Sequence, residues 1–121
     1  MTMPYLEAAE AVNQSALELT RSHPEAMRGF KALGTAAYAD GALTRKTKEL
    51  IALALSVAAR CDGCVAYHAR RLCELGVERA QVVEALGIAL QMGGGPSMVY
   101  GGDALRAYDS FCAKADAAEA A

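Results

Sequence analysis

Apolar residues recur at helical spacing through almost the whole chain, and this periodicity limits the possible folds more than any other feature. In the first segment they stand three or four residues apart, at Leu6, Ala9, Val12, Ala16 and Leu19. That spacing places side chains on one face of a helix. No segment shows the alternation of apolar and polar residues typical of a strand. The pattern predicts an all-α fold of about six helices, the first of which ends near Arg21.

Capping residues and glycines divide the following segment into two more helices. Ser22 can cap a second helix, and Glu25 stands three residues later as in a capping box. The stripe expected to be buried on this helix consists of Met27, Phe30, Leu33, Ala36 and Ala37. Gly41 ends the unit, and Thr44 is a cap for a third helix. The later turns of that helix, LIALALSVAA, are apolar all round, which predicts a central position.

Three helices are expected in the second half of the chain. The fourth runs from the first cysteine pair to Leu75, with Gly76 as its stop. The fifth runs from about Glu78 to Met92 and directs four residues inward, at Val82, Val83, Leu86 and Leu90. The glycine-rich GGGPS then breaks the chain with a flexible connection. The last helix includes Ala104, Leu105, Tyr108, Phe111 and Cys112, and the tail over 115–121 is expected to fray.

Composition indicates a single domain over residues 1–121 that associates with copies of itself. Hydrophobic residues make up 54% of the chain although aromatic residues are only 6% and tryptophan is absent. A chain of this length with so much small apolar surface is expected to bury part of it against other subunits. The net charge is −2 and the charges are interspersed. Neither nucleic acid nor a membrane is therefore an expected partner.

The N-terminal residues show no basic segment followed by an apolar run, and no segment is apolar enough to span a membrane. These features favour a cytoplasmic protein. In that compartment the four cysteines are expected to be thiols rather than a structural disulfide framework. The pair Cys61 and Cys64, with its two-residue spacer, is the exception, because such pairs close reversible disulfides.

Three potentially reactive side chains share one face at the start of the predicted fourth helix. With about 100° per residue, Cys61, Cys64 and His68 fall at roughly 0°, 300° and 340°. Cys64 and His68 are direct neighbours, so the imidazole can exchange a proton with the thiol or stabilise its thiolate. The helix N-terminus also favours a thiolate, whereas Asp62 opposes it slightly. Gly63 lets the turn between the sulfurs adjust.

Two other interpretations of these cysteines stay open. Free cysteines are often simply buried, and a lone Cys-x-x-Cys is a weak signal. Zinc is the second interpretation, because cysteine and histidine are ordinary zinc ligands, but a closed structural site needs a fourth ligand. On the same helical wheel Cys73 would project at about 120°, away from the other three side chains. We therefore expect neither a metal nor another cofactor.

Two stretches resemble a known family. Glu49, which stands twelve positions before Cys61, and the stretch CDGCVAYH together resemble the motif of the alkylhydroperoxidase D (AhpD) family. That family is grouped with the carboxymuconolactone decarboxylases. The later stretch ALQMGGGPSMVYGGDALRAYDSF is similar to the single-domain members. Together the two stretches extend the resemblance over roughly residues 25–112.

The resemblance implies an all-helical fold that assembles as trimers or hexamers. It also implies a thiol peroxidase or disulfide reductase that acts on a hydroperoxide or a disulfide. A partner dithiol, such as a lipoylated protein, would recharge it. By motif position Cys64 is the peroxidatic thiolate, Cys61 the more exposed resolving thiol, His68 the proton carrier and Glu49 the residue that orients it. If the third and fourth helices fold back antiparallel, helix geometry brings Glu49 to His68 or to a bridging water before it reaches either sulfur.

The chain departs from the pattern at one position, because the AhpD proper has a histidine where this chain has Gly63. Carboxymuconolactone decarboxylases in turn usually lack the cysteine pair. Two alternative functions follow: a lyase that decarboxylates a small acid, and a non-enzymatic redox sensor or small-molecule binding module. All three functions fit the same fold.

Overall fold

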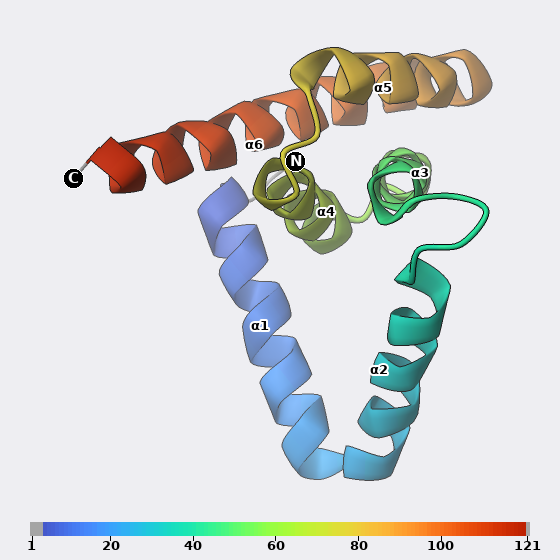
Figure 1. Cartoon of the computed structure of the whole chain (residues 1–121), viewed down its shortest axis with the longest axis vertical. Coiled ribbons are helices and arrows are strands. Elements are labelled where there is room, and N and C mark those ends of the chain that lie inside the picture. The colour runs from blue at the N-terminus through green and yellow to red at the C-terminus, as the bar shows by residue number, and fades with distance from the viewer. Residues whose placement is uncertain (1–3, 121) are drawn as a thin grey trace.

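The structure, a computed structural model that describes residues 4–120, consists of six helices joined by short turns (Figure 1). They are α1 (Tyr5–Ser22), α2 (Pro24–Tyr38), α3 (Arg45–Ala58), α4 (Asp62–Glu74), α5 (Arg79–Gly93) and α6 (Gly95–Ala120). The prediction of an all-α fold is confirmed over this range. None of these helices combines the length and apolar character needed to cross a membrane.

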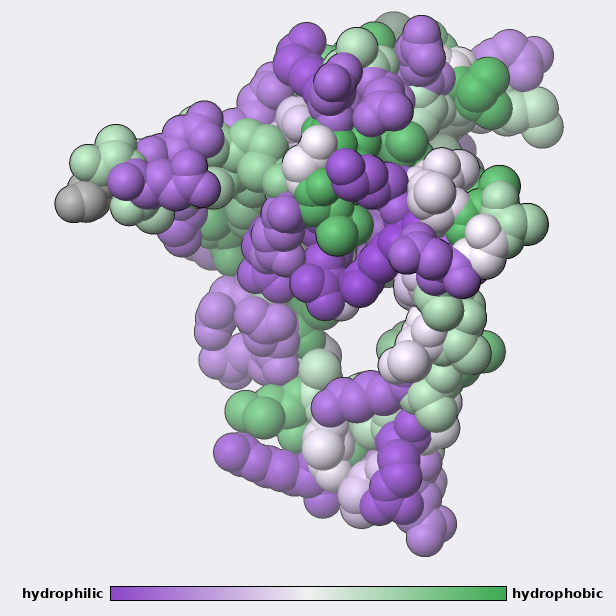
Figure 2. All heavy atoms as spheres, viewed as in Figure 1, coloured by the Kyte–Doolittle hydropathy of each residue, from purple (hydrophilic) through white to green (hydrophobic). Residues whose placement is uncertain are grey.

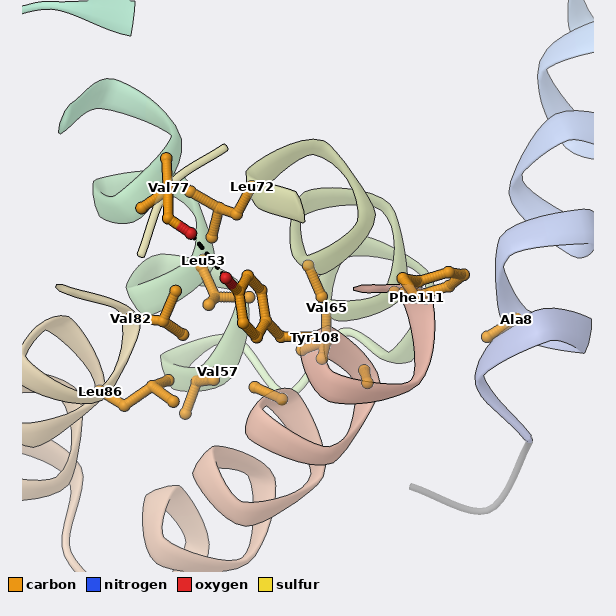
Figure 3. Packing of buried hydrophobic residues seen from close by; sticks show 14 of the residues in the cluster. Ala8, Leu53, Val57, Val65, Leu72, Val77, Val82, Leu86, Tyr108 and Phe111 are labelled. Atoms are coloured by element: carbon orange, nitrogen blue, oxygen red, sulfur yellow. Dashed lines mark hydrogen bonds between the residues drawn. The ribbon is translucent and has the colours of Figure 1, made fainter. Parts of the chain in front are cut away.

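The hydrophobic core lies where α3 to α6 meet the first turns of α1 (Figure 3). Helix α3 contributes Leu53 and Val57, which are fully buried, in agreement with the central position predicted for it. Tyr108 of α6 lies across the same core and donates a hydrogen bond to the Val77 carbonyl over 2.6 Å. That bond satisfies the buried hydroxyl, which would otherwise oppose burial.

Helices α1 and α2 form a V-shaped arm that extends away from this core (Figure 1). The space-filling view shows an opening between the two helices (Figure 2). Helix α2 has no buried residue, and Phe30 and Leu33 are 69% and 65% exposed. The prediction that Met27, Phe30, Leu33, Ala36 and Ala37 form a buried stripe is therefore wrong within one chain. The helix is amphipathic as predicted, but no element between residues 4 and 120 buries its apolar face.

Periodicity also predicts burial at other positions that the structure leaves exposed. On α5, Val82 and Leu86 are buried whereas Val83 and Leu90 are exposed. On α1, Ala9 is buried while Leu6 and Leu19 are exposed. The apolar stripes of both helices are wider than the surface that the neighbouring helices cover.

The turn between α1 and α2 is shorter than expected. Ser22 is the last residue of α1, and His23 caps α2 by accepting a hydrogen bond from the Ala26 amide at Nδ1 over 3.4 Å. The predicted capping box of Ser22 and Glu25 does not form because the chain is still helical at Ser22. Pro24 occupies the first helical position, where a missing N–H costs nothing.

The glycine-rich connection before α6 is a sharp bend and not a flexible segment. Gly94 alone separates α5 from α6 and has a positive φ of 68°. A Cβ on Gly93 would lie 1.9 Å from the Ser97 hydroxyl oxygen, so the bend needs glycine there. Helix α6 continues to Ala120, whereas a frayed tail was expected; residue 121 lies outside the described range. Alanine, the best helix former, accounts for this continuation.

Candidate active site

The turn between α3 and α4 delivers the first cysteine to the start of α4. Arg60 has a positive φ of 55°, an unusual conformation for a residue other than glycine. Its amide donates to the Val57 carbonyl over 3.1 Å, and the Cys61 amide donates to the Ser56 carbonyl over 3.2 Å. This pair of bonds is the Schellman arrangement that ends a helix. The chain therefore reverses at once, and α4 packs back against α3.

Cys61 is the N-cap of α4, and its sulfur accepts a hydrogen bond from the Cys64 amide over 3.2 Å. The two sulfurs are bonded, with the Cα atoms 5.2 Å apart. Cys64 is exposed and Cys61 is half-buried. The expectation that Cys61 is the more exposed thiol is therefore reversed in the single chain. The capping position explains this, because it folds the Cys61 side chain back over the first turn of α4.

Gly63 is required for close packing and not for backbone freedom. It lies in the first turn of α4, and a Cβ added to it would lie 2.7 Å from Val12 Cγ2 of α1. That distance is shorter than real Cβ contacts. Helix α1 thus covers the position at which the AhpD proper has its additional histidine.

We expect Gly63→His to lower the free energy of unfolding by about 1–3 kcal/mol, the range for overpacked sites. Chemical denaturation measures this change. Val12→Ala, which removes the obstructing methyl groups, should recover part of the loss when combined with Gly63→His. Equal losses in the wild-type and Val12→Ala backgrounds would show that the contact with α1 does not limit position 63.

The buried centre of the site is a pair of side chains from α3 and α4. Glu49 is 1% exposed, and its Oε2 lies 2.7 Å from His68 Nδ1. The prediction that Glu49 reaches His68 is confirmed. A carboxylate only accepts hydrogen bonds, so the His68 Nδ1–H is the donor of this hydrogen bond and Glu49 Oε2 is the acceptor. The other nitrogen, Nε2, is left to exchange a proton with a reacting group.

Two further residues surround this pair, and sequence reasoning did not identify them. Arg45 lies 3.8 Å from Glu49 Oε1, and the Tyr38 ring centroid is 6.0 Å from that of His68. Burial, and then the Glu49 charge, raise the pKa of Tyr38. Arg45 precedes Glu49 by four residues, a spacing that could have suggested the contact. Nothing local connects Tyr38 to His68.

Two more tyrosines, Tyr67 and Tyr100, contact different residues of the site. The Tyr67 ring meets the His68 ring edge-on at 5.0 Å and limits its rotation. Tyr100 of α6 reaches the N-terminus of α4, where a hydrogen bond with Asp62 raises the pKa of Tyr100. The Asp62 carboxylate is thus engaged beside the cysteines.

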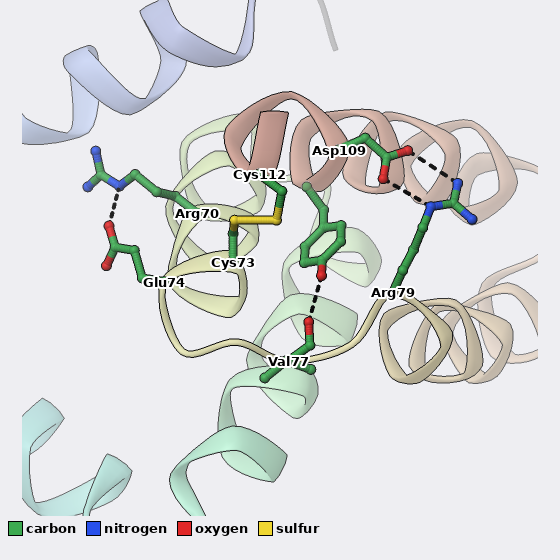
Figure 4. The surroundings of a disulfide bond; sticks show 8 residues. Arg70, Cys73, Glu74, Val77, Arg79, Asp109 and Cys112 are labelled. Atoms are coloured by element: carbon green, nitrogen blue, oxygen red, sulfur yellow. Dashed lines mark hydrogen bonds and ion pairs between the residues drawn. A yellow bond between two sulfur atoms is a disulfide. The ribbon is translucent and has the colours of Figure 1, made fainter. Parts of the chain in front are cut away.

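Cys73 and Cys112 form a second disulfide, with the Cα atoms 5.5 Å apart (Figure 4). The expectation that these two cysteines are free thiols is wrong in this structure. Cys73 lies on α4 and Cys112 on α6, two helices that pack along each other. The residues are 39 positions apart, so the contact follows from tertiary structure and not from a local pattern.

Comparisons with known proteins agree with this fold. The model of the carboxymuconolactone decarboxylase family matches residues 24–109. An apo crystal structure of a member of that family from Legionella pneumophila has a TM-score of 0.87 and 42% identity, covering 89% of this chain and 96% of that one. A Thermotoga maritima member, with a suggested role in an antioxidative response, has a TM-score of 0.76 and 30% identity over 95% of each chain.

A sequence relative extends the comparison. An uncharacterized protein of Cupriavidus necator is 38% identical over 100 residues, which cover 83% of this chain and 88% of its own length. The family match covers most of the chain, and the resemblance noted in the cysteine motif falls within it. This chain belongs to the carboxymuconolactone decarboxylase family.

Proposed function

We propose that this protein is a cytoplasmic thiol-dependent oxidoreductase, an alkylhydroperoxidase or disulfide oxidoreductase that works through Cys61 and Cys64. The observation that carries the proposal is the contact of buried Glu49 with half-buried His68, which stands one helical turn from Cys64 on α4. An imidazole held by a carboxylate beside a cysteine is the arrangement of an activated nucleophile. The suggested antioxidative role of the Thermotoga relative supports the same chemistry.

The first step is attack by the Cys64 thiolate on the terminal oxygen of a hydroperoxide. The O–O bond breaks, Cys64 becomes a sulfenic acid, and the departing alkoxide takes a proton from His68 to leave as an alcohol. The Cys61 thiol then attacks the Cys64 sulfur, which releases water and forms the disulfide. A partner dithiol, such as a lipoylated protein, reduces that disulfide by two exchange steps. With a disulfide substrate, the same two cysteines act through a mixed disulfide.

Glu49 acts in this scheme as a positioning residue. Its carboxylate, held inside the protein, fixes the His68 ring and assigns the proton to Nδ1. His68 Nε2 is then the nitrogen that donates and recovers the proton. Gly63 provides no second imidazole, so His68 is the only histidine that the motif contributes.

Rapid mixing of the reduced protein with an organic hydroperoxide tests the proposal. We expect a loss of two thiols per chain that is at least about a hundredfold faster than for free cysteine, the lower range for a positioned acid–base group. The measurement uses the Cys73→Ser/Cys112→Ser background, so that every thiol counted belongs to Cys61 or Cys64. Thiol loss no faster than that of free cysteine would contradict a peroxidase. The same protein would then be assayed for disulfide reduction.

We also propose that the chain assembles as a homotrimer or homohexamer through the α1–α2 arm. Phe30 and Leu33 expose large apolar surfaces on a helix that has no buried residue. An arm of this kind is stable when other copies cover it, since exposed apolar patches mark interaction sites. The high apolar fraction of the composition favours the same assembly.

Phe30→Glu is expected to convert the assembly into single chains, because a carboxylate cannot enter an apolar interface without a partner. Light scattering coupled to gel filtration measures the mass. Lys31→Glu, the neighbouring exposed position on α2, is the matched control and should leave the mass unchanged. An assembly that survives Phe30→Glu would place the interface elsewhere.

A further inference from the structure

The disulfide of Cys73 and Cys112, whose surroundings Figure 4 shows, involves neither Cys61 nor Cys64. Cys64 and Cys73 lie on the same helix, nine residues apart. Nine residues correspond to a rise of about 13.5 Å and a rotation of about 180°, so the two sulfurs face opposite sides of α4. Neither pair can therefore exchange directly with the other. Any chemistry at Cys73 needs its own route for a reactant.

The structure contains such a route in a cavity of about 460 Å³ beside Cys73. The cavity lies between α1, α4 and α6, and its apolar wall includes Leu6, Ala9 and Phe111. Cavities of about 300–1,000 Å³ are typical of small-molecule sites. Cys73 lines the cavity and is half-buried, so this residue lies at a wall that a small reactant can reach.

Charged side chains of both signs line the same cavity. Arg70 and Lys114 carry positive charges, and Glu10 and Glu74 carry negative charges. Arg70 precedes Cys73 by three residues, and its Nε lies 3.5 Å from Glu74 Oε1 (Figure 4). A cation one helical turn from a sulfur favours its thiolate form. Because Arg70 and Glu74 pair with each other, Lys114 and Glu10 are the charges that a small molecule with both a carboxylate and an amino group can match.

We propose that Cys73–Cys112 is a second thiol–disulfide site, opened by a charged low-molecular-weight thiol that enters this cavity. The incoming thiolate attacks Sγ of Cys73, the bond to Cys112 breaks, and Cys112 leaves as a thiolate that takes a proton from water. A second molecule of the same thiol attacks the mixed disulfide on its non-protein sulfur. The sum is one protein disulfide and two small thiols converted into two cysteine thiols and one small disulfide.

This site gives each chain a second pair of exchangeable cysteines. Full reduction then takes up four electrons in place of two, because each disulfide accepts two. The partner of the first pair is a dithiol that reaches exposed Cys64, whereas the partner of the second is small enough to enter the cavity. The two pairs can therefore hold different oxidation states in one chain.

Thiol release from the folded Cys61→Ser/Cys64→Ser variant tests this site, because only one disulfide remains in it. The probe is reduced glutathione, a thiol with carboxylates and an amino group, and neutral 2-mercaptoethanol is compared with it. We expect two thiols per chain in the absence of denaturant and a transient glutathione adduct that mass spectrometry locates on Cys73. Release that occurs only after unfolding in urea would overturn the proposal. Two thiols in the purified oxidised protein before any reductant is added would also overturn it.

Lys114→Gln tests recognition through the cavity without disturbing the core, since Lys114 is exposed. The rate with glutathione should fall by about twofold or more, the size expected for one exposed charge, while the rate with 2-mercaptoethanol stays unchanged. Lys46→Gln removes an exposed charge that lies outside the cavity and should alter neither rate. Equal rate changes with both thiols would show that the cavity does not select the charged one.

Discussion

Cys64→Ser is expected to abolish hydroperoxide consumption, with a loss of at least about a thousandfold, because no other group replaces a nucleophile that forms a covalent intermediate. Cys64 is the exposed cysteine of the pair and stands one turn from His68. Cys61→Ser should still allow the first step. The reaction then stops at the Cys64 sulfenic acid, since the resolving thiol is missing.

Stopped-flow thiol counting and trapping of sulfenic acid with dimedone measure these two outcomes. Both substitutions are made in the Cys73→Ser/Cys112→Ser background, so that the second disulfide cannot contribute thiols. If Cys61→Ser is inactive and forms no sulfenic acid while Cys64→Ser is active, then Cys61 is the attacking thiol and Cys64 the resolving thiol. We expect the opposite assignment, because Cys61 is half-buried at the N-cap of α4 whereas Cys64 is exposed.

The same variants separate the proposed activity from its alternatives. A lyase of the decarboxylase type should keep its activity when both Cys61 and Cys64 are replaced. A redox sensor should oxidise once per chain and show no turnover with any reductant. Only a thiol oxidoreductase loses its catalytic turnover with Cys64→Ser while the fold is retained.

The helices could be predicted from sequence because their signals are local. Periodic apolar residues, caps such as Thr44 and the stop at Gly76 act within a few residues of the chain. The start of α6 could not be placed from sequence because the glycines at 101 and 102 lower helix propensity, whereas in the structure both lie within the helix. Burial on α2 was misjudged because an amphipathic face shows that a helix needs a partner but not where the partner is.

The candidate site was predictable in part for the same reason. Once α4 folds back on α3, helix geometry brings Glu49 to His68, and the structure has this contact. The disulfide of Cys73 and Cys112 joins positions 39 residues apart, and no local pattern predicts it. The close approach of Val12 to Gly63 likewise depends on how α1 packs across α4.

The second large effect is expected at His68, where His68→Leu, which leaves no hydrogen-bond donor, should destabilise the fold more than Glu49→Gln does. Removal of the imidazole leaves the buried Glu49 carboxylate with Arg45 at 3.8 Å, and the Arg45 side chain is 42% exposed. Removal of one partner from a buried pair costs about 3–5 kcal/mol because the remaining charge lacks compensation. Glu49→Gln keeps an acceptor at this position, because the amide oxygen can still accept a hydrogen bond from the His68 Nδ1–H. That change should cost about 1 kcal/mol, the value of one hydrogen bond.

Urea denaturation of both variants and of the double variant, all at one protein concentration, measures this asymmetry. In the Glu49→Gln background, His68→Leu should cost only about 1 kcal/mol, because no buried carboxylate is left without a partner. Additive losses would show that the 2.7 Å contact does not couple the two residues. Equal losses from the two single variants would mean that Arg45 compensates the carboxylate by itself. The predicted order of these losses in the free energy of unfolding therefore depends on the imidazole as the main partner of the buried Glu49 carboxylate.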